Sequence, residues 1–284
     1  MLGIRRNRSL FILLAIASNA ITFSAAPPTT FLKFKREFSS RILNLENEIC
    51  SFFGLTSPQW RINRTDCKIH RFIKKNLVDP IERLWKKSTD RALSPRFRAI
   101  VAELSDKFKR KVPHVVNAKN DNGGDLHFGE SDSVTIFIDE ESINSHNLSD
   151  NQVKSTILHE WMHVNMFHGV ESKFLNNFIK ENQKNMDTAK LKSFETRFAI
   201  LQEEIADIFA GLVGGLDIVN AFIEKHEKLI SEDHIEVSRG GQCHPKSPDR
   251  VKYMKRLRDE MLQDPDYEDG QCYPAALDTW LYTN

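Results

Sequence analysis

The chain has 284 residues, a formal net charge of +1, 28% charged residues and 40% apolar residues. This length is enough for one sizeable domain or two small ones with a real core. The near balance of acidic and basic side chains argues against a nucleic-acid or polyanion surface, so we expect no nucleic-acid partner. The composition is that of an ordinary soluble protein.

The first twenty residues have the order of a secretory signal peptide. Arginines between positions 5 and 8 precede an apolar run (10–17), and a small-residue triplet (18–20) follows. We expect cleavage after the triplet, a linker over 21–30 and an exported, periplasmic or secreted product. The alternative is an uncleaved anchor, although the run extended to Ala26 is marginal for spanning a bilayer. No later segment is long and apolar enough to span, so no stable membrane span is expected after cleavage.

Four cysteines are present, and none of them forms a CxxC pair. In an oxidising compartment an even number predicts two disulfides, for which three connectivities exist. We favour Cys50–Cys67 and Cys243–Cys272, because each of these pairs closes a short local loop. The second bond would tether a C-terminal tail formed by residues 263–284.

The rest of the chain predicts a mainly helical α+β fold. Residues 31–111 place apolar side chains at helical spacing, which favours a helical N-terminal region packing on a domain over 112–262. Short β-rich segments at 112–116, near 126–128 and at 134–138 predict a small antiparallel sheet next to the following helix. Ser149 and Gln152 have capping-box spacing and open that helix.

This helix carries the motif HEWMH. Residues four apart on a helix lie about 40° apart around its axis, so His159 and His163 share one face and can bind one ion. Glu160 lies beside that face, where a carboxylate can take a proton from metal-activated water without occupying a coordination position. Leu158 and Trp161 point the opposite way, toward a core. The motif predicts a zinc site.

A third protein ligand must come from elsewhere. His168 follows closely, but on a continuous helix it lies about 180° from His159, so we interpret it as a non-ligand. In the segment QEEIAD, Glu203 and Asp207 share a face that small residues surround, which would let a neighbouring helix approach closely. This pattern predicts that Glu203 reaches the zinc ion while Asp207 accepts the second N–H of a ligating histidine. We interpret Glu204, about 100° off this face, as a surface charge.

Three motifs in order carry a family resemblance: HEWMH with a further His five residues later, then EEIAD, then HPKSPDR at 244–250. Over roughly residues 130 to 260 the chain resembles the gluzincin metallopeptidases of the CAAX-prenyl-protease, HtpX-like and Oma-type family, in a soluble exported form. The resemblance implies a zincin-like domain holding one Zn²⁺ per chain. It also implies that His159, His163 and Glu203 are the ligands, that Glu160 is the general base and that Asp207 forms a hydrogen bond with a ligand.

In that family the His-Pro loop lies near the metal. His244 is therefore either an oxyanion stabiliser or a fourth ligand that occludes the resting site. The alternative is an ordinary loop histidine beside a helix-starting proline. Neither the segment 171–200 nor the N-terminal region has a counterpart that would indicate a substrate.

The expected function is zinc-dependent endopeptidase activity on unfolded or exposed protein segments, with a zinc-activated water and Glu160 as general base. The substrate peptide is expected to lie extended along the strand 134–138, taken as an edge strand. One alternative is a catalytically silent exported module, chaperone-like or interacting, that keeps the gluzincin fold. Another is a toxin or effector protease with a single dedicated substrate.

Overall fold

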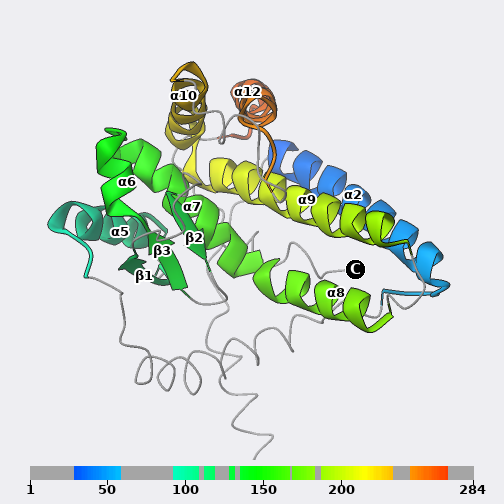
Figure 1. Ribbon diagram of the computed structural model, residues 1–284. Coiled ribbons are helices and arrows are strands. Elements are labelled where there is room, and N and C mark those ends of the chain that lie inside the picture. The colour runs from blue at the N-terminus through cyan, green and yellow to red at the C-terminus, as the bar shows by residue number, and fades with distance from the viewer. Residues whose placement is uncertain are drawn as a thin grey trace, which may run out of the picture.

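A computed structural model gives the fold (Figure 1). It describes residues 29–58, 92–108, 112–118, 128–131, 135–166, 168–182, 187–232 and 244–267. The expected signal peptide and Cys67, Cys243 and Cys272 lie outside these ranges, and so do both expected disulfides. Cys50 is buried in the first described helix.

Helices make up most of the described chain, as the sequence predicts. They are α2 (Thr29–Phe53), α5 (Pro95–Phe108), α6 (Glu140–Ser145), α7 (Asp150–Met166), α8 (His168–Asn182), α9 (Thr188–Gly214), α10 (Leu216–Ser231) and α12 (Ser247–Gln263). In the described ranges, none of these helices combines the length and the apolar character that crossing a bilayer requires.

The long helix α9 runs through the middle of the molecule and contacts α2, α7, α8, α10 and α12 (Figure 1). Its buried Phe209 meets Phe31 and Phe38 of α2 at ring-centroid distances of 5.5 and 6.2 Å. On the other side of the fold, Phe108 of α5 packs edge-on against Trp161 of α7 at 5.3 Å. The N-terminal helices therefore share one core with the helix that carries HEWMH.

Helix α2 begins at Thr29, so the last two residues of the expected linker are helical. The helix is tied to α9 by Arg41, whose guanidinium donates to both carboxylate oxygens of Glu204 at 2.7 and 2.6 Å. The Glu204 side chain is only 17% exposed. The interpretation of Glu204 as a surface charge is therefore wrong: it anchors one helix to another.

Three short strands form a mixed sheet in the order β1-β3-β2: β1 (His114–Asn117), β3 (Thr135–Ile138) and β2 (Gly129–Ser131). β2 pairs antiparallel with β3, but β1 pairs parallel with it, so the expectation of a purely antiparallel sheet is wrong. Two parallel strands need a crossover between them and cannot be joined by a tight hairpin. Because β3 is the central strand, residues 135–138 are not an edge to which a peptide could add.

Helix α7 starts where the capping box predicts. The Ser149 amide donates to Gln152 Oε1 at 2.9 Å, and the Gln152 amide donates to Ser149 Oγ at 3.3 Å. Arg96 of α5 secures the same end, donating to Asp150 Oδ1 at 2.8 Å and to the Leu148 carbonyl at 2.6 Å. These contacts fix the start of α7 and therefore the direction in which its histidines project.

The end of α9 packs too closely for a side chain. A β-carbon added at Gly214 would lie 2.7 Å from Ile218 Cβ, an atom next to the backbone that cannot move aside. We expect Gly214→Ala to lower the free energy of unfolding by about 1–3 kcal/mol, the usual cost of overpacking. Chemical denaturation of both proteins measures the difference.

Gly169 of α8 provides the matched control, because no atom lies within 4 Å of a β-carbon added there. Gly169→Ala should leave stability unchanged or raise it by up to about 1 kcal/mol, since alanine is the better helix former. Equal effects of the two substitutions would contradict the close packing at Gly214.

Candidate metal centre

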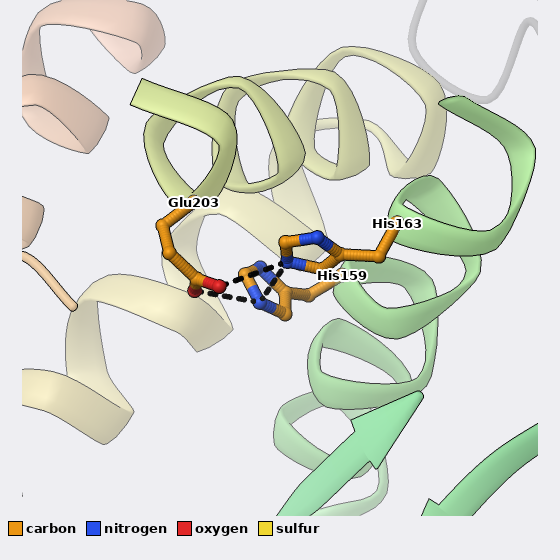
Figure 2. A group of neighbouring side chains, drawn as sticks. All are labelled: His159, His163 and Glu203. Carbon is orange, nitrogen blue, oxygen red and sulfur yellow. Dashed lines mark hydrogen bonds and ion pairs between the residues drawn. The ribbon is translucent and has the colours of Figure 1, made fainter. Parts of the chain in front are cut away.

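Two helices bring three predicted ligands to one point. His159 and His163 extend from α7 toward the carboxylate of Glu203 on α9 (Figure 2). The two Nε2 atoms are 3.1 Å apart. Glu203 Oε2 lies 3.2 Å from His159 Nε2, and Glu203 Oε1 lies 3.2 Å from His163 Nε2. These three side chains could hold a metal ion.

The spacing fits a small tetrahedral cation. Metal–ligand bonds of about 2.0–2.1 Å at tetrahedral angles separate the ligand atoms by about 3.3–3.4 Å. The observed separations of 3.1 and 3.2 Å are close to this value. Two imidazole nitrogens and one carboxylate oxygen also form a donor set that zinc accepts, with room for a fourth ligand. The residues present therefore fit the ion that the motif predicts.

Glu160 lies beside the three ligands, as helix geometry predicts. Its Oε1 is 3.8 Å from His159 Nε2, and the residue is 7% exposed. Its carboxylate is farther from His159 Nε2 than that of Glu203, which is 3.2 Å away, and it does not belong to the ligand group. This leaves a buried carboxylate next to the three side chains that could hold an ion.

The other nitrogen of His159 faces Asp207. His159 Nδ1 lies 2.7 Å from Asp207 Oδ1, the contact that the sequence predicts. A proton on Nδ1 leaves the Nε2 lone pair directed at the other ligands. Asp207 has no exposed surface. This contact would leave Nε2 as the nitrogen of His159 that is available to a metal.

Arg250 and Tyr253 of α12 hold Asp207 in turn. Arg250 donates to both carboxylate oxygens at 2.8 and 2.6 Å, and the Tyr253 hydroxyl donates to Oδ2. Burial would raise the pKa of Asp207, but Arg250 and His159 hold it far below its ordinary value. Sequence reasoning assigned no role to these two partners, although Arg250 belongs to the motif HPKSPDR.

The centre favours a cation on electrostatic grounds. Burial would lower the pKa of His159, but the carboxylates of Asp207 and Glu203 outweigh it and raise that pKa to about 10. Burial would likewise raise the pKa of Glu203, yet the surrounding histidines, His163 first, hold it well below its ordinary value. The site therefore keeps its carboxylates charged and attracts positive charge, as a proton or as a metal ion that replaces it.

His168 does not face away from the centre, so that expectation is wrong. Helix α7 ends at Met166 and α8 begins at His168, which turns the ring of His168 back onto His163. The two Nδ1 atoms are 2.9 Å apart and the ring centroids 4.9 Å apart. His168 is not one of the three ligand residues, as expected, and it is 3% exposed. Burial and the neighbouring His163 lower the pKa of His168 well below its ordinary value.

His244 lies at the start of the segment that leads into α12. Its Nδ1 is 3.0 Å from Glu203 Oε2, and its side chain is 36% exposed. It is thus in contact with a predicted ligand without belonging to the three-residue group. This position brings together the His-Pro loop and the metal centre.

A buried lysine, Lys225, lies next to the centre. Lys225 of α10 donates to Thr156 Oγ1 at 3.1 Å, one turn of α7 before Glu160, and its Nζ lies 5.1 Å from the centroid of the Phe222 ring. No carboxylate of the described residues forms an ion pair with it. Burial, and next the charge of Arg250, lower its pKa from 10.5 to about 7, although Asp207 and Glu160 oppose this. The sequence offered no signal for this lysine.

Neighbouring glutamates on α9 allow a sharp test of the ligand assignment. Losing a residue that hydrogen-bonds to a metal ligand typically weakens metal binding by roughly 10- to 100-fold. We expect Glu203→Gln to weaken zinc binding by more than this, because it removes the charge of a ligand itself. Glu204→Gln alters a carboxylate that faces Arg41 instead and should bind zinc like the wild type. Competition with a chromophoric chelator measures both affinities. Equal losses would contradict the assignment.

Lys225 predicts a pH-dependent stability difference. A lysine with a folded pKa near 7 loses its proton on folding between pH 7 and 10.5, so its cost is full below pH 7 and disappears above pH 10.5. We expect Lys225→Met to raise the free energy of unfolding by a few kcal/mol at pH 6.5, at about 1.4 kcal/mol per pKa unit. The gain should shrink as the pH approaches 10.

Denaturant titrations of both proteins at several pH values measure this gain. Lys255→Met, at an exposed lysine paired with Glu227, is the control and should show no such trend. A stability difference between wild type and Lys225→Met that is constant from pH 6.5 to 10 would show that Lys225 titrates like an exposed lysine.

Comparison with known proteins gives no further assignment: no protein-family model, curated protein or solved structure matches this chain.

Proposed function

We propose that the chain is a zinc-dependent endopeptidase that hydrolyses peptide bonds in unfolded or exposed protein segments. One observation carries the proposal: Glu160 lies beside two imidazole nitrogens that are 3.1 Å apart and a carboxylate that places one oxygen 3.2 Å from each of them, a spacing that suits one tetrahedral ion. A purely structural site has no need of a buried glutamate next to its ligands. The gluzincin resemblance of the three motifs points the same way.

His159, His163 and Glu203 would hold the zinc ion. When bound, the ion supplies Lewis acidity, which acidifies a water molecule and polarises a scissile carbonyl. Glu160 accepts the proton of that water and delivers it to the leaving amine. Asp207 keeps His159 in the tautomer that binds through Nε2.

His244 has two roles open to it in this proposal. Its imidazole, 3.0 Å from Glu203, is close enough to donate to the oxyanion of a substrate. Alternatively it acts as a fourth ligand that occludes the resting centre. The first role predicts that replacing His244 lowers turnover, and the second predicts that it raises it.

The extended substrate would pair with β2 rather than with the central strand β3. β2 is at the edge of the sheet and packs against α7, the helix that carries His159 and Glu160. A peptide added to this edge forms main-chain hydrogen bonds, which are independent of side-chain identity. This arrangement suits a protease that acts on extended segments of many sequences.

Cleavage-site mapping tests the proposal. The protein is incubated with a mixed, partly unfolded protein pool, and new peptide termini are identified by mass spectrometry. We expect new termini with the wild type and a loss of about 10²- to 10⁴-fold with Glu160→Gln, because proton transfer is lost while the ligands remain. Glu204→Gln is the matched control and should cleave like the wild type.

The outcome also separates the alternatives. Identical termini with wild type and Glu160→Gln, at one zinc per chain in both, would favour a catalytically silent zinc module. Cleavage of a single protein in the pool would favour an effector protease with one dedicated substrate. Failure of the wild type to bind zinc would overturn the proposal altogether.

A further inference from the structure

His168 stands outside the three ligands and outside the proposed chemistry, yet it is almost completely buried against one of them. Its ring is 3% exposed and meets that of His163 at an interplanar angle of 77°. The 2.9 Å distance between the two Nδ1 atoms is that of a hydrogen bond. One ring must therefore donate and the other accept.

Only one of the two proton arrangements is compatible with a metal. If His168 donated, the Nδ1 of His163 would be the acceptor and its proton would have to be on Nε2. That proton would point into the 3.2 Å space between His163 Nε2 and Glu203 Oε1, where the ion belongs. If His163 donates, its Nε2 lone pair is free for the metal, and His168 presents an unprotonated Nδ1.

We propose that His168 is a positioning residue for the metal centre, whose Nδ1 accepts the Nδ1–H of His163 and thereby fixes the nitrogen through which His163 binds the ion. The inference rests on the proposed zinc site but not on peptidase activity. Asp207 does the same for His159 with a carboxylate. The two ligands on α7 would thus be oriented by different acceptors, one anionic and one neutral.

Helix α9 holds this acceptor in place. Gln202 Nε2 donates to the His168 carbonyl at 3.4 Å, and Ser172 Oγ donates to Gln202 Oε1 at 2.7 Å. Gln202 is 6% exposed and directly precedes the ligand Glu203. The same turn of α9 therefore positions a ligand and the start of the helix that carries His168.

Zinc affinity tests the inference without any substrate. We expect His168→Phe, which keeps the ring but removes the acceptor, to weaken zinc binding about 10- to 100-fold in chelator competition with the full chain. His168→Asn, which places a carbonyl oxygen near the position of Nδ1, should recover most of this loss. His226→Phe, at a buried histidine of α10 that forms a hydrogen bond with Ser247, is the control and should bind zinc like the wild type.

A spectroscopic measurement on the wild type covers the case in which a variant fails to fold. In ¹⁵N NMR of the zinc-loaded protein, His163 should carry its proton on Nδ1 and His168 should be unprotonated at Nδ1. Equal zinc affinity of wild type and His168→Phe, or a protonated Nδ1 on His168, would overturn the inference while leaving the zinc site intact. Absence of zinc binding by the wild type would overturn the inference and the proposed function together.

Discussion

The buried carboxylate of Asp207 is the charge on which the arrangement of the centre depends. An isolated carboxylate without exposed surface would be very costly, so its partners are required by the fold itself. Arg250 and Tyr253 bring α12 to it, and His159 brings α7. Because Asp207 belongs to α9, one compensated charge joins three helices. Removing any partner would leave part of that charge uncompensated.

The N-terminal helix α2 packs against α9 and forms ion pairs with α9 and α12. Arg41 pairs with Glu204 of α9, while Glu37 pairs with Arg256 and Lys33 with Glu260, both on α12. The exposed pairs contribute little each, but the aromatic contacts with Phe209 add buried apolar area. Helix α2 thus stabilises the two helices that present Glu203 and Arg250.

Local patterns predicted the parts of the centre that lie within one helix. The i,i+4 spacing of His159 and His163 and the capping box at Ser149 depend only on helical geometry, so the sequence was sufficient for them. The direction of β1 depends on a crossover, which strand patterns do not encode. His168 was misplaced because the angular argument assumed one continuous helix, whereas the chain starts a new one at that residue.

The position of Glu203 was only partly predictable from local patterns. Its distance from His163 along the chain indicates nothing, but the small residues around its helical face predicted that another helix would approach there, and α7 does so. The role of Arg250 was not predicted, because a contact across two helices leaves no periodic pattern. The burial of Lys225 was not predicted for a related reason: nothing in the sequence distinguishes a buried lysine from an exposed one.

One turn and a half of α9 performs four separate tasks in succession. Gln202 binds the start of α8, Glu203 faces the histidines, Glu204 pairs with α2, and Asp207 holds His159. Each residue advances the helix by about 100°, so these directions are set by helical phase alone. Losing one residue from the preceding turns would present Glu204 where Glu203 belongs, and gaining one would present Gln202 there. During evolution, therefore, length changes between α8 and α9 should accumulate before the helix starts and not within it.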